Sequence, residues 1–332
     1  MRVDHIRAKN YRTLEDVTVE FSSNYCTISG HNNAGKSCMI SLIGHLLDEP
    51  DSRPWISGDE GLTYKDDKTK WVSGTPNIGL EYKLQISLIE DQVLADFIKR
   101  QSGLAFEKDH IDSLVNIVVD PSVYIVNTVY VNDINVSAPV ANDILDKIRS
   151  AKTLFLHNST REQSDYYYRA GRHVVLYNLP LSPQDQGLLK EAEIQLQRQI
   201  KKVAKSQTGE LNSMLGKLSD KFDVEFSAID SSSSRRVHLG INLTDKNVEM
   251  PLLSWGSGTQ NRTRVLMSVL QANRIRTGEE PQNRITPIVV IEEPESFLHP
   301  SPQADFGKVL QALSEELRIQ IIVSTHSPYM LN

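Results

Sequence analysis

Residues 30–37 read GHNNAGKS and match the spacing G-x-x-x-x-G-K-[ST] of a loop that wraps phosphate groups. Gly30 and Gly35 would let backbone N–H groups approach phosphate oxygens that a side chain would keep away. Lys36 would reach the β- and γ-phosphates, and the Ser37 hydroxyl would bind Mg²⁺. The alternative is a glycine turn before an ordinary helix. The loop residues expected to contact a nucleotide are Gly30, His31, Asn32, Asn33, Ala34, Gly35, Lys36, Ser37 and Cys38.

A second motif, PIVVIEEPESFLHP, places two carboxylates after four apolar residues. A strand that ends at the phosphates should deliver one carboxylate to the Mg²⁺ shell and one to the attacking water. We therefore assign Glu292 to the metal and Glu293 to the role of general base or water-orienting residue. The alternative is a charged strand end that is capped by Pro294.

Two further stretches could complete a phosphate site. His326 in STHSP follows the apolar strand IIV, where it could bind the γ-phosphate, although a lone histidine at this place can also be structural. The loop GSGTQ precedes a helix and offers Ser257, Gly258 and Gln260 at a second anion site, or else it caps a surface helix.

The elements around these motifs predict how they are positioned. YCTISG reads as a strand that enters the glycine loop, and apolar residues at helical spacing follow Ser37. From residue 258 the chain alternates helix, strand, helix and strand, which predicts a parallel sheet with covering helices. Because parallel strands end at one edge, the glutamates and His326 should lie beside the phosphate loop.

Three regions are expected along the chain. Residues 1–140 would form an N-terminal lobe with alternating strands, and residues 251–332 would form a C-terminal lobe with the later motifs. Residues 141–250 would be an insertion, in which residues 183–221 read as a helical hairpin that opens with Ser182-Pro183.

Composition limits the classes of protein. The 332 residues carry a formal net charge of −6, so a globally basic nucleic-acid surface is absent. No run of 18 apolar residues occurs, which argues against a membrane-spanning helix. The two cysteines are too few for a disulfide framework, and we expect a cytoplasmic protein.

Taken together, the motifs resemble those of ABC-type ATPases of the SMC/RecF class. GHNNAGKS resembles the Walker A motif, GSGTQ the ABC signature, VVIEEPES the Walker B motif with its catalytic glutamate, and STHSP the switch-histidine loop. More narrowly, NNAGKS, IEEPESFLHP and STHSPYMLN resemble the OLD (overcoming lysogenization defect) nucleases and defence relatives such as the Gabija nuclease. The motifs lie at both ends of the chain, and residues 49–250 carry little family signal.

The resemblance implies an α/β fold, an ABC-type P-loop ATPase head with a mixed sheet and an inserted helical dimerisation segment. It implies ATP and Mg²⁺ as cofactors. It also implies a homodimer or higher oligomer in which Ser257 and Gly258 of one subunit cap ATP bound by Lys36 of the other. Glu293 and His326 would be the catalytic residues in cis, and Ser37 and Glu292 would hold the metal. Departures from the family pattern are Glu292 in place of aspartate, Thr259 in place of glycine, His299 at the D-loop position and Gln85 as the best Q-loop candidate.

OLD proteins continue into a Toprim nuclease domain, which needs a glutamate and a D-x-D pair for divalent metals. No D-x-D occurs here, so we expect the ATPase portion of an anti-phage nuclease that gates a Toprim domain outside residues 1–332. The alternatives are an ATPase subunit with a separate effector protein, as in two-gene defence systems, a RecF/SMC-like DNA-repair ATPase, and a transporter ATPase with a permease partner. DNA would be contacted by the full assembly.

Overall fold

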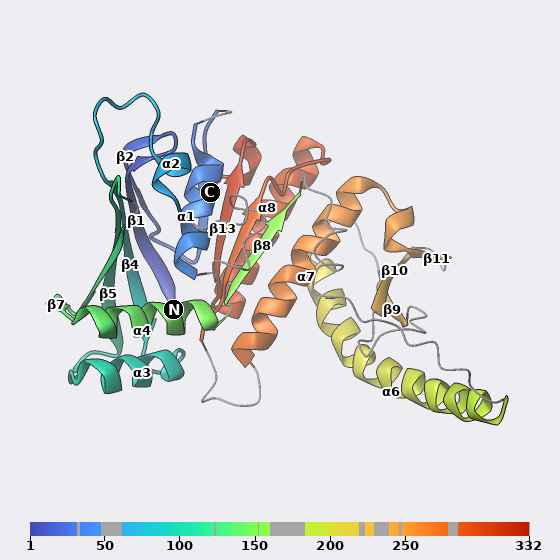
Figure 1. Ribbon diagram of the computed structural model, residues 1–332. Helices are drawn as coiled ribbons and strands as arrows, with labels where there is room; N and C mark the ends of the chain where they lie inside the picture. Colours follow the sequence, from blue (N-terminus) through green and yellow to red (C-terminus); the bar gives the residue numbers. More distant parts are fainter. Residues whose placement is uncertain are drawn as a thin grey trace.

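The computed structural model describes most of the chain (Figure 1). The described residues are 1–31, 34–47, 62–122, 124–151, 153–159, 183–218, 223–228, 239–245, 248–277 and 285–331. Asn32 and Asn33 of the expected phosphate loop therefore lie outside the described residues.

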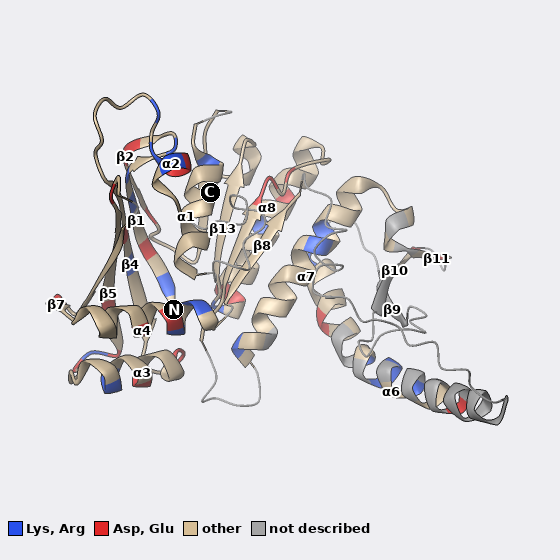
Figure 2. Cartoon of the chain, viewed as in Figure 1, with Lys and Arg blue, Asp and Glu red and all other residues tan. Residues whose placement is uncertain are grey.

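One lobe is built on a six-stranded antiparallel sheet with the order β2-β1-β4-β5-β6-β7. The alternating apolar residues that predicted these strands point into the core: every second residue of β5 is buried. Acidic and basic residues both occur along these strands (Figure 2). Arg7 of β1 forms an ion pair with Asp16 of β2, whose partner in the strand register is Lys9. The strands are β1 (Arg2–Tyr11), β2 (Leu14–Glu20), β4 (Ile78–Ser87), β5 (His110–Val119), β6 (Ile125–Val131) and β7 (Ile134–Asn135).

The centre of the molecule is a four-stranded parallel sheet with the order β3-β13-β12-β8. It confirms the parallel sheet predicted from the alternation of helices and strands. Ile288 and Val290 of β12 face one hydrophobic core, whereas Val289 and Ile291 face the other. Burial on both faces explains the continuous apolar runs of β12 and β13. The strands are β3 (Tyr25–Ser29), β8 (Leu154–Asn158), β12 (Ile288–Glu292) and β13 (Gln320–Thr325).

Helices cover both faces of the central sheet. Helix α1 lies between the two sheets, and α7 and α8 cover the opposite face of the central sheet (Figure 1). Helices α3 and α4 pack on each other beside the antiparallel sheet (Figure 1). The helices are α1 (Lys36–Leu47), α2 (Tyr64–Asp67), α3 (Gln92–Ser102), α4 (Ala138–Ser150), α7 (Ser257–Thr277) and α8 (Pro300–Leu317).

The helical hairpin expected at residues 183–221 is wrong: one helix, α6, runs without a break over Pro183–Leu215. The hairpin required a break between Ser206 and Thr208, but the helix continues there, and the Thr208 hydroxyl donates to the Ala204 carbonyl at 3.0 Å. A single glycine costs a helix only about 1 kcal/mol, which the buried Leu211 and Leu215 outweigh.

After α6 the chain returns through a small antiparallel sheet with the order β11-β10-β9. Its strands are β9 (Asp223–Ala228), β10 (Leu239–Asp245) and β11 (Val248–Pro251). The start of α6 extends away from the body of the molecule (Figure 1). Strand β8 also falls inside the range 141–250 that we expected to be an insertion, yet it pairs with β12 in the central sheet. Among the described residues, no helix has the length and apolar character needed to cross a membrane.

Candidate nucleotide site

The phosphate loop links β3 to α1, as the sequence predicted. Gly35 has a φ of +91°, a left-handed conformation that favours glycine, and a Cβ there would lie 2.7 Å from Leu14 Cδ2. Helix α1 then begins at Lys36, with Ser37 exposed in its first turn and Ala34 exposed just before it. The open backbone N–H groups of a helix start attract anions, so the start of α1 suits a bound phosphate group.

The Lys36 side chain folds back onto the phosphate loop. Its side chain is 9% exposed, and Nζ donates to the carbonyl oxygens of Gly30 at 2.8 Å and His31 at 3.0 Å. The ammonium group therefore sits within the loop, where incoming phosphate oxygens would replace carbonyls as its partners. Cys38, two residues further along α1, is partly buried with Sγ 3.4 Å from Thr13 Oγ1.

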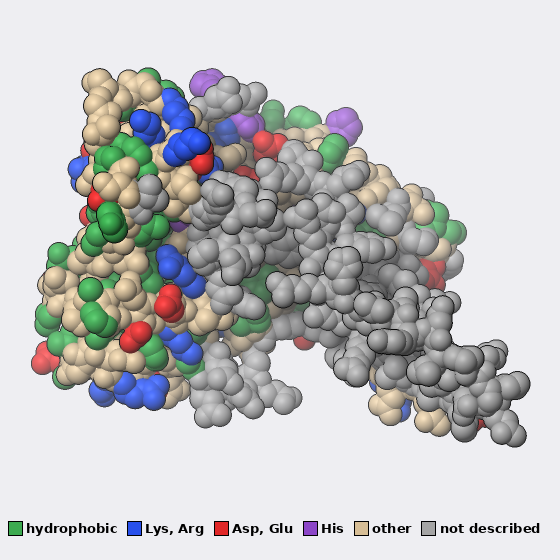
Figure 3. Space-filling model, viewed as in Figure 1, with side chains coloured by type: hydrophobic (Ala, Val, Ile, Leu, Met, Phe, Trp, Pro, Cys, Tyr) green, Lys and Arg blue, Asp and Glu red, His purple; other side chains and the backbone are tan. Residues whose placement is uncertain are grey.

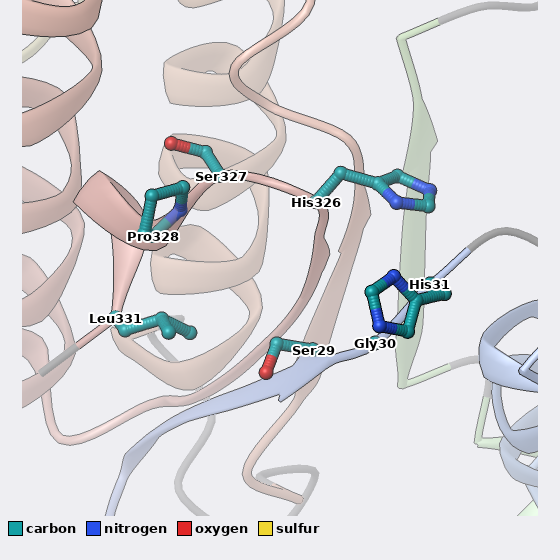
Figure 4. Close-up of a pocket in the computed structure, with 7 residues that line it drawn as sticks. All are labelled: Ser29, Gly30, His31, His326, Ser327, Pro328 and Leu331. Carbon is teal, nitrogen blue, oxygen red and sulfur yellow. The ribbon is translucent and has the colours of Figure 1, made fainter.

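A cavity of about 570 Å³ adjoins the loop, a volume within the range of small-molecule sites. His31 and His326 come together at one part of it, and Leu331 and Pro328 line another (Figure 4). The cavity, the buried ammonium group of Lys36 and the glycine at the start of α1 all fit a bound nucleotide.

The register of the central sheet brings the separate motifs together. Strand β13 lies between β3 and β12, with Thr325 opposite Ser29 and Ser324 opposite Glu292. All three strands end at one edge, so the phosphate loop, the two glutamates and His326 become neighbours. Histidine side chains show at the surface along this upper rim (Figure 3).

Glu293 occupies a constrained position beside His326. Its φ is +50°, which is uncommon for a residue other than glycine. The Glu293 N–H donates to Ser324 O at 2.8 Å, and the Ser296 N–H donates to Glu293 O at 2.9 Å. These bonds aim the carboxylate at the histidine: Oε1 lies 3.6 Å from His326 Nε2.

His326 also faces Lys36, with Nδ1 3.4 Å from Nζ. An ammonium group can only donate, so this contact requires an unprotonated Nδ1 and places the proton of a neutral ring on Nε2, toward Glu293. The structure thus brings together three residues that the sequence assigned to one site, from three segments of the chain.

Glu292 is the last residue of β12, whereas Glu293 lies just beyond the strand. Its carboxylate accepts a hydrogen bond from Asn158 Nδ2, which lies opposite it on β8. Among the described residues, no group of three or more histidine, cysteine or acidic side chains could hold a metal by itself. Mg²⁺ commonly takes one or two protein oxygens together with phosphates and water, a set that Ser37 and Glu292 would fit.

Sequence reasoning missed Glu295, the third glutamate of EEPES. Its Oε1 accepts the backbone N–H of His326 at 2.6 Å, so it fixes the start of the histidine loop. Its Oε2 is buried and has no hydrogen-bond partner in the part of the chain that the structure describes. Burial, and next the charge of Glu295, raise the pKa of Tyr25, whose hydroxyl donates to Met330 O at 3.2 Å. The glutamate itself is visible in the EEPES motif, but nothing in the spacing of the sequence indicated that it contacts His326.

The GSGTQ turn begins α7 and lies against the loop after β12. A Cβ on Gly258 would meet Phe297 O at 2.7 Å and Leu298 Cδ2 at 2.8 Å, so only glycine permits this approach. Ser257 is exposed, and Gln260 Nε2 donates to Trp255 O at 2.7 Å.

Within one chain, α7 packs on β8 and β12, whereas the phosphate loop follows β3 at the opposite edge of the sheet. Strands β3 and β8 are three strand spacings apart, about 14 Å. The turn and the phosphate loop of one chain therefore belong to different parts of the sheet edge. Figure 2 shows basic residues along the first half of α7.

Gln85 and His299, the residues suggested for the Q-loop and D-loop positions, lie in different parts of the fold. Gln85 lies in β4 of the antiparallel sheet, opposite Arg2 and Asp112. His299 is exposed and precedes α8 without a side-chain hydrogen bond to the helix start.

A family model described as AAA ATPase domain matches residues 1–164 and 139–331. The chain belongs to this family. No curated protein sequence matches it significantly.

Solved SMC head domains share the fold. A head bound to the C-winged helix domain of ScpA superposes with a TM-score of 0.59 at 15% identity over 99% of this chain and 91% of that one. A head from Thermotoga maritima gives 0.51 at 14% identity, again over 99% and 91%. A head derived from Pyrococcus furiosus, bound to the C-terminal domain of ScpA, gives 0.53 at 13% identity over 99% and 90%. The expectation of an α/β head of the ABC and SMC type is confirmed.

Proposed function

We propose that this ATPase head hydrolyses ATP at the site formed by Lys36, Glu293 and His326. The observation that carries the proposal is the placement of His326 between the phosphate-loop lysine and the carboxylate, 3.4 Å and 3.6 Å from them. Lys36 would neutralise charge on the terminal phosphates, and Glu293 would orient the attacking water and accept its proton. Bound Mg²⁺, held by Ser37 and Glu292, would draw further charge from the phosphate oxygens.

The GSGTQ turn would act at the nucleotide site of a second copy of the chain. Ser257, Gly258 and Gln260 would contact ATP held by a second copy of the chain, since the turn and the phosphate loop of one chain lie at different places along the sheet edge. The exposed Ser257 hydroxyl and the start of α7 offer donors for phosphate oxygens. ATP would then bind two heads together, and hydrolysis would release them.

Glu293→Gln tests this directly, because it keeps the shape of the side chain but cannot accept a proton. We expect the variant to bind ATP and accumulate as a dimer, which light scattering would report as a doubled mass with ATP. Ser257→Arg, which places bulk on the exposed turn, should stay monomeric under the same conditions. An unchanged mass of Glu293→Gln with saturating ATP would contradict the two-copy arrangement.

For the biological role, we propose the ATPase part of an OLD-type nuclease, in which dimerisation gates a Toprim domain outside residues 1–332. The resemblance of IEEPESFLHP and STHSPYMLN to that family supports it. The second candidate is a RecF/SMC-like DNA-repair ATPase, favoured by the likeness to SMC heads and by the extended helix α6.

Two measurements separate the candidates. The coding frame around residues 1–332 should encode a strand-borne glutamate and a D-x-D pair if the OLD-type proposal holds. The full gene product, with any neighbouring partner, should then cut DNA in a Mg²⁺-dependent way that Lys36→Ala changes. ATP-dependent, salt-sensitive DNA binding without cleavage would favour the repair ATPase instead.

A further inference from the structure

Asn261 lies one residue after the GSGTQ turn and joins three segments of the chain. Its side chain is 5% exposed. Nδ2 donates to Pro294 O at 3.1 Å and, more weakly, to Ser296 O at 3.4 Å. Oδ1 lies 3.0 Å from His157 Nε2 on β8. The two carbonyls can only accept, which fixes the amide orientation and makes His157 the donor to Oδ1.

His157, the donor to Asn261, is buried and held neutral. It is 1% exposed at the end of the central sheet, and its burial lowers the pKa of its imidazole below the ordinary value. A neutral ring with its proton on Nε2 is the tautomer that the amide oxygen requires. Asn261 and His157 therefore have one hydrogen-bonding arrangement, because the two backbone carbonyl groups bound by Asn261 can only accept.

The carbonyls that Asn261 holds belong to the loop that carries the catalytic carboxylate. Pro294 directly follows Glu293, and the Ser296 N–H donates to Glu293 O at 2.9 Å. Ser296 Oγ lies 3.4 Å from Glu293 Oε2. Glu293 keeps its left-handed backbone conformation within this set of bonds. A small shift of α7 would therefore change the position of the Glu293 carboxylate.

We propose that Asn261 is a positioning residue that couples the placement of the GSGTQ turn to the aim of Glu293. Engagement of the turn by ATP on a second copy would then set the carboxylate in its own chain for hydrolysis. The inference rests on the proposed hydrolytic role of Glu293, and it adds a link between the two sites that runs through one amide and one imidazole.

The test compares turnover with ATP binding in Asn261→Asp and Asn261→Leu. The aspartate turns an oxygen toward the two carbonyls, and the leucine removes every polar partner at similar volume. We expect kcat to fall by about 10- to 100-fold, as small misplacements of catalytic groups do, while Kd for ATP stays within about threefold. Native kcat in a folded Asn261→Leu would overturn the proposal, and so would a loss confined to KM.

A matched control is Asn10→Asp, which removes a comparable buried amide on β1 of the antiparallel sheet. Asn10 is 6% exposed, and its Nδ2 donates to Pro76 O at 2.7 Å. We expect this variant to lower Tm with kcat unchanged. An equal loss of kcat at equal Tm in the two asparagine variants would overturn the proposal, because it would show that loss of stability alone explains the effect.

The double variant with Glu293→Gln separates this inference from the proposed function. If Asn261 acts through Glu293, adding Asn261→Leu to Glu293→Gln should lower kcat no further. A wild-type rate in Glu293→Gln would refute the hydrolytic site itself, whereas a slow Glu293→Gln beside a fast Asn261→Leu refutes only the coupling. Should both Asn261 variants unfold, His157→Phe removes the supporting donor, and native kcat in that variant would reject the inference.

Discussion

His326 Nε2 lies 3.6 Å from Glu293 Oε1, at the point where strands β13 and β12 end side by side. Each residue is fixed by its backbone: Glu295 accepts the N–H of His326, and Ser324 O accepts the N–H of Glu293. Both side chains remain about one third exposed, so they can still meet a phosphate group and a water molecule.

His326→Ala should therefore slow hydrolysis more than it weakens binding. The loss of a group that orients or moves a proton typically lowers a rate by about 10²- to 10⁴-fold. We expect kcat to fall in this range with Kd for ATP changed by less than about fivefold. Steady-state kinetics and calorimetry check this, and His110→Ala, on β5 of the other sheet, is the control with native kcat. A selective loss of binding would contradict the assignment.

Lys36→Ala should weaken nucleotide binding. The ammonium group is the cation inside the phosphate loop, and a hydrogen bond to a charged group contributes about 1.5–3 kcal/mol. Affinity should thus fall by about 10- to 100-fold in calorimetry. Lys9→Ala, which removes an exposed lysine 3.8 Å from Asp16, should bind ATP normally. Normal affinity in Lys36→Ala would place the nucleotide elsewhere.

Gly258→Ala should destabilise the contact between α7 and the loop after β12. The added Cβ would meet the backbone oxygen of Phe297 at 2.7 Å, and backbone atoms cannot move aside cheaply. Overpacking of this kind lowers the free energy of unfolding by about 1–3 kcal/mol. Gly256→Ala is the matched control, because no atom of the described residues beyond its chain neighbours would lie within 4 Å of the added Cβ. We expect a change under about 0.5 kcal/mol. Equal urea midpoints for the two variants would contradict the close approach.

Acidification should weaken the fold in part through His157. Burial lowers the pKa of its imidazole in the folded state, with a smaller contribution from the charge of Arg264. The unfolded chain, with a histidine pKa of about 6.5, then binds the proton more tightly. The contribution of neutral His157 is complete above that pH and is lost as the pH falls toward the folded pKa.

Urea unfolding at pH 7.5 and at pH 5.5 measures this contribution. The wild type should lose more unfolding free energy between the two conditions than His157→Gln, which cannot take up the proton but can still donate to Asn261. Other titrating groups are common to both proteins, so the difference isolates His157. Parallel losses in the two proteins would show that His157 does not titrate differently in the folded and unfolded states.

The sequence alone determined the local chemistry of this protein. The spacing of Gly30, Gly35 and Lys36, and the apolar strands that end at Glu292 and before His326, predicted the phosphate loop and the parallel sheet. These features are local, since a loop, a strand or a helix start is set by neighbouring residues. The expected hairpin failed because the weak local signal at Thr208 and Gly209 was outweighed by burial of Leu211 and Leu215, which belong to one hydrophobic cluster with residues of α7 and α8.

Only the tertiary structure decided which groups support the residues that we propose to be catalytic. Asn158, His157 and Glu295 carried no recognisable spacing, because their partners lie on strands and helices that the sequence does not order. The sheet order β3-β13-β12-β8 places β8 beside β12 and separates the GSGTQ turn from the phosphate loop. Hydrogen bonds between distant segments depend on that order, and the order is chosen by burial over the whole core rather than by any single motif.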